Sequence, residues 1–218
     1  MLTELIDYSY YNKVSLVLLL PLFIVFLMCM IDLTRTKFLF RSLFSNRYFY
    51  KYPYDTVSTI SFYQVIVMSY LSILFGLFLM LLLYDVEFIY QHFFDAFTTC
   101  LYISMGCFCV KYLLSEFLYN YSNRKLYFKQ MFVLETSYLA VVLLVLFLPL
   151  CYVFLHLNNY HLLRNYLFIL ALITYIIRFI LLVLNNKNLL SGKILYIILY
   201  LCTLEIVPFI YLFKSYTE

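Results

Sequence analysis

Five ionisable residues lie inside long apolar stretches of the sequence, and Glu116, close to the end of its stretch, is set aside as interfacial. The other four are Lys111, Glu135, Arg178 and Glu205. A charge at the centre of a bilayer costs about 2.5–3.5 kcal/mol on insertion scales, so such residues pair with one another or serve the movement of protons and ions. Two cations and two carboxylates therefore allow two kinds of chemistry. One is a set of ion pairs that joins helices, and the other is a relay in which Glu205 carries a proton or an ion.

The apolar stretches that hold these charges are long enough to cross a membrane. Hydrophobic residues make up 66% of the 218 positions and charged residues 12%, against about 45–50% and 25% in a soluble domain. Runs of about 20 apolar residues span a hydrocarbon core of about 30 Å, and spans without strand-like alternation are helices. We predict an all-α polytopic membrane protein, a bundle of six transmembrane helices in one domain over residues 1–218. The expected spans are 14–31, 60–84, 96–118, 131–155, 166–184 and 194–213.

The distribution of Lys and Arg predicts how these spans are oriented. Ten of these cations fall in the loops 32–59, 119–130 and 185–193, while the two tails and the two remaining loops hold three. Loops rich in Lys and Arg stay in the cytoplasm. Both termini are therefore expected outside the cytoplasm. The first apolar run is too long for a signal peptide, so we expect it to remain as a span.

The four intramembrane charges are predicted to meet near the cytoplasmic side of the bundle. At 1.5 Å per residue, Lys111 lies about 10 Å, Arg178 about 9 Å and Glu135 about 6 Å from that side, and Glu205 lies about 16 Å from it. Side chains lean toward the N-terminus of their helix. The two cations therefore lean toward the membrane centre, and Glu205 leans toward the cations. We predict a charge network of these four residues.

A proline in the last apolar stretch adds a second polar feature. Pro208 removes the hydrogen bond to the carbonyl of Leu204 and kinks its helix. The freed carbonyl adjoins Glu205. The predicted kink and polar focus consists of Tyr200, Cys202, Thr203 and Pro208. Two interpretations stay open for this region, a lock between helices and a relay or counter-charge for a substrate.

The longest loop, 32–59, is basic and rich in aromatic residues. If it is helical as far as Lys51, the cations Lys37, Arg41, Arg47 and Lys51 fall within an arc of about 120°. This pattern is typical of a helix that lies among lipid headgroups against anionic lipid. The alternatives are a loop that only fixes topology and a docking surface for a membrane protein or a second copy of the chain. No nucleic-acid recognition motif accompanies these charges, so we expect no nucleic-acid partner.

Metal and catalytic chemistry have weaker support in the sequence. Three histidines and three acids are expected near the outer face, but they lack the spacing of a metal site, so we predict no metal and no cofactor. The six cysteines fall inside expected spans and are interpreted as small apolar residues. Phosphate-loop and hydrolase motifs are missing, so no catalytic residue is assigned. The outer-face residues are His92, His156, His161, Asp85, Glu87 and Asp95.

The C-terminal stretch YLCTLEIVP resembles the closing motif of a family of Bacteroidota membrane proteins of unknown function. The motif of that family reads Tyr-Leu-Cys-x-Leu-Glu-x-x-Pro. This resemblance implies a bundle of several spans in a bacterial inner membrane, and it supplies no activity. The matching positions are Tyr200, Leu201, Cys202, Leu204, Glu205 and Pro208, with weaker similarity at 42–47, 110–114 and 176–179.

Three functions remain open for such a protein. Small loops and missing catalytic motifs favour an accessory or assembly subunit of a membrane or envelope complex. The second is a small proton- or ion-coupled transporter with Glu205 as the carrier, which requires a water-accessible cavity at that residue. The third is an intramembrane or lipid-modifying enzyme, which requires His92, His156 and His161 to converge in one pocket.

Overall fold

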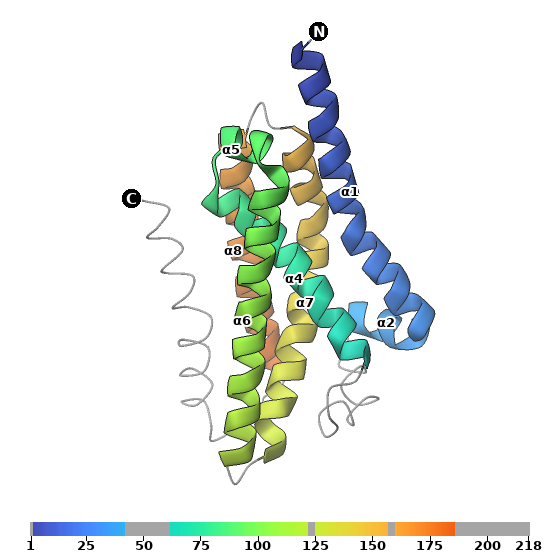
Figure 1. The fold of residues 1–218 in the computed structure, drawn as a ribbon. Helices are drawn as coiled ribbons and strands as arrows, with labels where there is room; N and C mark the ends of the chain where they lie inside the picture. Colours follow the sequence, from blue (N-terminus) through green and yellow to red (C-terminus); the bar gives the residue numbers. More distant parts are fainter. Residues whose placement is uncertain (1, 42–61, 122–124, 157–159, 186–218) are drawn as a thin grey trace.

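The computed structural model describes residues 2–41, 62–121, 125–156 and 160–185 (Figure 1). Within these residues the chain forms seven helices and no strand, so the all-helical prediction is confirmed for this part of the chain. The helices are α1 (Leu2–Ile31), α2 (Leu33–Phe40), α4 (Phe62–Leu83), α5 (Val86–Gln91), α6 (Phe93–Tyr121), α7 (Lys125–Leu155) and α8 (Tyr160–Asn185).

Four of the described helices are long and apolar enough to cross a membrane. These helices are α1, α4, α6 and α7, and they match the first four expected spans. α8 covers the fifth expected span, and its apolar part in the described residues is Leu163–Thr174. The sixth expected span, 194–213, lies outside the described residues, so six spans stay a prediction. The segments that are long and apolar enough to span a membrane are Tyr10–Ile31, Phe62–Leu83, Phe93–Leu113 and Thr136–Leu155.

Successive long helices run in alternating directions, and contacts between distant residues show it. The hydroxyl of Tyr10 in α1 donates to the carbonyl of Phe154 at the end of α7, at 3.3 Å. The Tyr10 ring also stacks on Tyr90 of α5, with centroids 4.8 Å apart, and meets Phe93 of α6 edge-on at 5.8 Å. The start of α1, α5, the start of α6 and the end of α7 therefore share one end of the bundle (Figure 1). Which side of a membrane this end faces stays a prediction.

Helix α4 lies at the centre of the bundle, in contact with α1, α6 and α7. Five consecutive residues, 77–81, are buried, and five consecutive positions cover every direction around a helix. A helix that is apolar all round is suited to such a central position. By contrast, α1 exposes Leu19, Phe23 and Met30, which suit contact with lipid.

Two contacts fix α4 against α6. A Cβ atom on Gly76 would lie 3.3 Å from the Cα atom of Leu101, so the two backbones approach closely at this glycine. One turn further along α6, the Ser104 hydroxyl donates to the Ser72 carbonyl at 2.7 Å. Together these contacts set the register of the two antiparallel helices. That register determines which residues of α6 lie level with the start of α4.

Candidate functional site

Lys111 is the one member of the predicted charge network whose side chain the structure describes. It lies in α6 and is only 8% exposed. Seven residues separate it from Ser104, which contacts Ser72, so antiparallel packing brings Lys111 level with Val65 in the first turns of α4. Lys111 is therefore buried near the end of the bundle at which α4 begins.

The helix register is expected to bring two further members of the network to the same level. The rings of Phe93 and Phe154 are 6.0 Å apart and tie α6 to α7. Along these helices Lys111 lies about 27 Å from Phe93, and Glu135 lies about 29 Å from Phe154. Arg178 lies about 27 Å along α8 from its first residue, which follows the end of α7 closely in sequence. By residue count, the backbones of Lys111, Glu135 and Arg178 are therefore expected at similar heights in the bundle.

The charge network itself stays a prediction. The side chains of Glu135 and Arg178 are outside the described part of the structure. Glu205 lies outside the described residues, together with the predicted kink and polar focus of Tyr200, Cys202, Thr203 and Pro208. On α7, Thr136 and Ser137 are buried beside Glu135, so this level of the bundle is polar on more than one helix.

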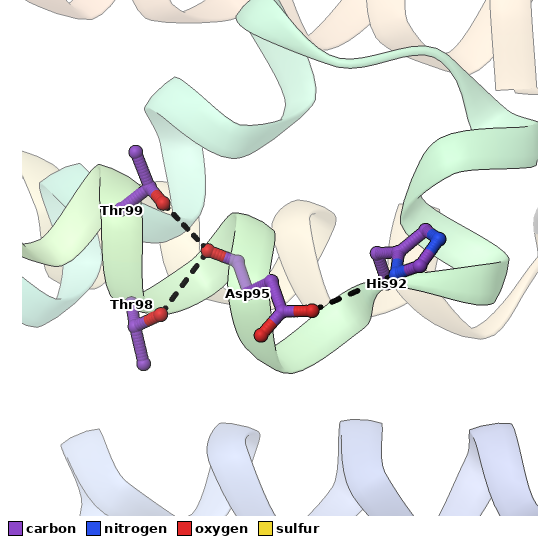
Figure 2. Close-up of polar contacts among 4 residues, drawn as sticks. All are labelled: His92, Asp95, Thr98 and Thr99. Atoms are coloured by element: carbon purple, nitrogen blue, oxygen red, sulfur yellow. Dashed lines mark hydrogen bonds and ion pairs between the residues drawn. The ribbon is translucent and has the colours of Figure 1, made fainter.

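The described histidines make local contacts on exposed helix turns. The Nδ1 atom of His92 lies 3.6 Å from Oδ2 of Asp95, and the two side chains are 53% and 82% exposed. Figure 2 shows this pair at the start of α6, where the Asp95 backbone carbonyl accepts hydrogen bonds from the hydroxyls of Thr98 and Thr99. The ring of His156 stacks on the ring of Tyr152, which lies one turn earlier at the end of α7, with centroids 4.4 Å apart.

Among the described residues, no three His, Cys, Asp or Glu side chains gather closely enough to hold a metal ion. The side chain of His161 is outside the described part of the structure. A convergence of His92, His156 and His161, which an enzyme would require, therefore stays untested.

A second polar cluster lies where α1 turns into α2. A carboxylate oxygen of Asp32 accepts hydrogen bonds from the Arg35 backbone N–H at 2.8 Å and from the Thr34 hydroxyl at 2.7 Å. Asp32 therefore caps the N-terminus of α2, as Asp commonly does. The Arg35 N–H is the main reason that the pKa of Asp32 is lower than usual, and the Thr34 hydroxyl lowers it further.

The same turn is joined to α4. The hydroxyl of Thr36 lies 3.0 Å from the Met28 carbonyl and 2.9 Å from the Asp32 carbonyl. Because that hydroxyl donates its one proton to a carbonyl, the Tyr63 hydroxyl 3.1 Å away is the donor to Thr36. The Arg35 guanidinium carbon lies 4.1 Å from the centre of the Tyr63 ring, which is a cation–π contact. We call Asp32, Arg35, Thr36 and Tyr63 the α2 joint.

The observed end of α2 limits the helix that was considered for the basic loop. A helix that continues to Lys51 would place Lys37, Arg41, Arg47 and Lys51 on one face, but α2 ends at Phe40, with Arg41 as its C-cap. The Arg35 side chain, which entered the sequence argument only as a topology charge, is buried against Tyr63. Lys37 and Arg41 are exposed, as the lipid-contact prediction requires. Arg47 and Lys51 lie outside the described residues.

Sequence reasoning missed Arg35, Thr36 and Tyr63. A local signal was present for the cap, because Asp32 follows an apolar run and precedes a helix. The contact with Tyr63 had no such signal, since the two residues that meet it lie in a different helix.

Comparison with protein families gives a match over most of the chain. The family described as Domain of unknown function (DUF4271) matches residues 11–215. The chain belongs to this family. The match confirms the expected membership of a family of unknown function, whereas an origin in Bacteroidota and the closing motif stay predictions. Comparison with curated proteins and with solved structures gives no match.

In this DUF4271 chain the two polar regions support different chemistry. Lys111 is a buried cation in a helix that is apolar enough to span a membrane, where it can hold a carboxylate or an anion electrostatically. The α2 joint fixes a short basic helix directly after the first span. The buried polar groups of the α2 joint position helices. The exposed cations Lys37 and Arg41 are available to a partner outside the bundle.

Proposed function

We propose that this DUF4271 protein is an accessory or assembly subunit of a complex in the bacterial inner membrane or envelope. The chain is an integral membrane protein with several spans. The observation that carries the proposal is the use of buried hydroxyl groups in the described bundle. Three of them lie within 3.3 Å of a backbone carbonyl of another helix, Tyr10 at Phe154, Thr36 at Met28 and Ser104 at Ser72.

Such contacts support a structural role. Hydrogen bonds between membrane helices stabilise one arrangement of the bundle. The close approach of α4 and α6 at Gly76 has the same effect, since packed small residues let helices meet. A bundle held in this way is suited to offer a fixed surface to a partner. In the proposed topology both termini lie outside the cytoplasm and the basic end of the bundle lies inside.

The experiment is purification of the tagged full chain from its own membrane in a mild detergent, followed by crosslinking and mass spectrometry. The proposal expects a membrane or envelope protein in stoichiometric amount, crosslinked at defined lysines. Recovery of the chain alone, or only as a homo-oligomer, contradicts a subunit role. An unrelated membrane protein of similar abundance with the same tag serves as the control.

A second function has one observation in its favour. Lys111 is buried in a helix long and apolar enough to cross a membrane. Charges retained inside a membrane commonly mark ion or proton pathways. The alternative is therefore a small proton- or ion-coupled transporter in which Glu205 is the carrier.

Proteoliposomes that contain a pH-sensitive dye distinguish the two functions. For a transporter, an imposed ion or pH gradient drives proton movement, and Glu205→Gln abolishes it while the protein stays abundant. For a subunit in which the charge network locks the bundle, Glu205→Gln instead lowers the amount of folded protein. Normal abundance together with normal function would overturn both roles of Glu205.

A further inference from the structure

Helix α2 has two faces of different character. One face is buried and carries Arg35, Thr36 and Leu39. The other carries Leu33, Lys37 and Arg41, which are exposed and spaced four residues apart. Residues four apart lie above one another on the same side of a helix. α2 therefore presents one apolar and two cationic side chains in a single stripe that points away from the bundle.

The place of this stripe in the fold relates it to the membrane boundary. The first membrane-spanning segment ends at Ile31, and Asp32 is the cap of α2. Leu33, which is 62% exposed, therefore stands at the edge of the hydrocarbon layer. Lys37 and Arg41 follow at about 6 and 12 Å along the helix axis. The stripe therefore begins directly after the first span, on a helix that turns at Asp32 and packs against the end of α1.

The α2 joint holds this stripe in a fixed position. Thr36 and Tyr63 join α2 to α1 and α4 by hydrogen bonds, and Arg35 rests on the Tyr63 ring. The helix is therefore already ordered before any ligand arrives. A pre-ordered site avoids the entropy cost of ordering a loop on binding.

We propose that Lys37 and Arg41 bind the phosphate groups of anionic phospholipids at this end of the bundle. Charge complementarity selects the ligand, because two exposed cations at a membrane boundary favour anionic over zwitterionic headgroups. The Arg41 guanidinium suits a phosphate especially well, since it donates two parallel hydrogen bonds. This site is separate from the charge network, and it does not depend on the subunit role.

The test uses the full chain in detergent with added phosphatidylglycerol or phosphatidylcholine, and native mass spectrometry measures the affinity for each lipid. Wild type is expected to prefer phosphatidylglycerol. The double variant Lys37→Gln/Arg41→Gln is expected to lose about 30-fold of that preference, given the usual attraction of two surface cations for anionic lipid. Added salt is expected to weaken the preference of wild type, because it screens exposed charges.

Two controls accompany the double variant. The exchange Lys37→Arg/Arg41→Lys keeps both charges and is expected to keep most of the preference. Lys13→Gln removes one cation from the first half of α1, well before the turn into α2, and is expected to leave the preference unchanged. Equal thermal unfolding midpoints of all variants in phosphatidylcholine show that each of them is folded.

An unchanged lipid preference in Lys37→Gln/Arg41→Gln overturns the proposal. A preference lost equally in Lys13→Gln also overturns it, since net charge would then explain the effect. If the double variant keeps its lipid preference but loses a crosslinked acidic protein, the stripe is a protein-docking surface.

Discussion

The close approach of α4 and α6 predicts that Gly76→Val destabilises the bundle. A Cβ atom at this position would lie 3.3 Å from the Cα atom and 3.4 Å from the backbone nitrogen of Leu101. Both neighbours are backbone atoms, so they move only if α6 moves. Valine adds two further methyl groups beyond that Cβ atom. The two helices must therefore separate at Gly76.

The expected loss follows from three contributions. Overpacking in a well-packed interior costs about 1–3 kcal/mol. Separation also stretches the bond of 2.7 Å from Ser104 to Ser72 one turn away, and a hydrogen bond between membrane helices contributes about 0.6 kcal/mol. The higher helix propensity of valine relative to glycine offsets a few tenths of a kcal/mol of this loss. We expect Gly76→Val to lower the free energy of unfolding by about 1–3 kcal/mol.

Gly106 provides a matched control on α6. It is exposed, and a Cβ atom there would meet nothing within 4 Å in the described structure. Gly106→Val is therefore expected to change the free energy of unfolding by no more than about 0.5 kcal/mol. The two variants make the same chemical change at two sites that differ in available space.

The assay is reversible unfolding of the full chain by sodium dodecyl sulfate in mixed micelles, followed by far-ultraviolet circular dichroism. Helical signal is the suitable probe because the chain contains no tryptophan. If Gly76→Val is as stable as Gly106→Val, α4 and α6 do not meet closely at Gly76, and the reasoning is refuted. A smaller effect of Ser104→Ala in the Gly76→Val background than in wild type would show that the two contacts are coupled.

Three further predictions use the same unfolding assay. Tyr70 is 1% exposed, and its hydroxyl has no hydrogen-bond partner among the described residues, so Tyr70→Phe should raise stability by about 1 kcal/mol; a loss would reveal a bond to that hydroxyl. In a double-mutant cycle, Thr36→Val and Tyr63→Phe should be coupled by about 0.6–1.7 kcal/mol, and additive effects would contradict the α2 joint. Asp32→Ala should cost about 1 kcal/mol at neutral pH through loss of the cap. The lower pKa of Asp32 in the folded chain means that its contribution is full above the unfolded value of about 3.9 and is lost as pH falls through the folded value. The cost of Asp32→Ala should therefore shrink below about pH 4, and a constant cost would contradict the carboxylate cap.

The helices were predictable because the bilayer imposes a length and a composition on each span. The first five expected spans coincide with α1, α4, α6, α7 and α8, although most of these helices extend past the apolar run. Apolar content marks the membrane-embedded part of a helix, and it carries no information on further turns in water. The short helix α5 was missed for the same reason, since it lies in a segment that was predicted only as a loop between spans.

The contacts between helices were not predictable from the sequence. The meeting of Thr36 with Tyr63 and of Ser104 with Ser72 depends on helix register, which is set by side-chain packing along the whole interface. The depth of Lys111 in the membrane was expected from residue count and stays a prediction, whereas its burial between helices is set by packing. The partner of a buried charge lies on another helix, and residue count in one helix cannot identify it.

The central position of α4 has a consequence for biosynthesis. α4 is made before α6 and α7, the two helices that later cover it. A growing chain that enters the bilayer therefore exposes α4 to lipid until those helices arrive. Its nearly uniform apolar surface keeps the free-energy cost of this exposure low, because lipid tails and leucine side chains are similarly apolar. Among the described helices, the one with the largest buried share is thus also one that is stable in lipid before its neighbours are made. Assembly becomes specific when Gly76 and Ser72 meet α6.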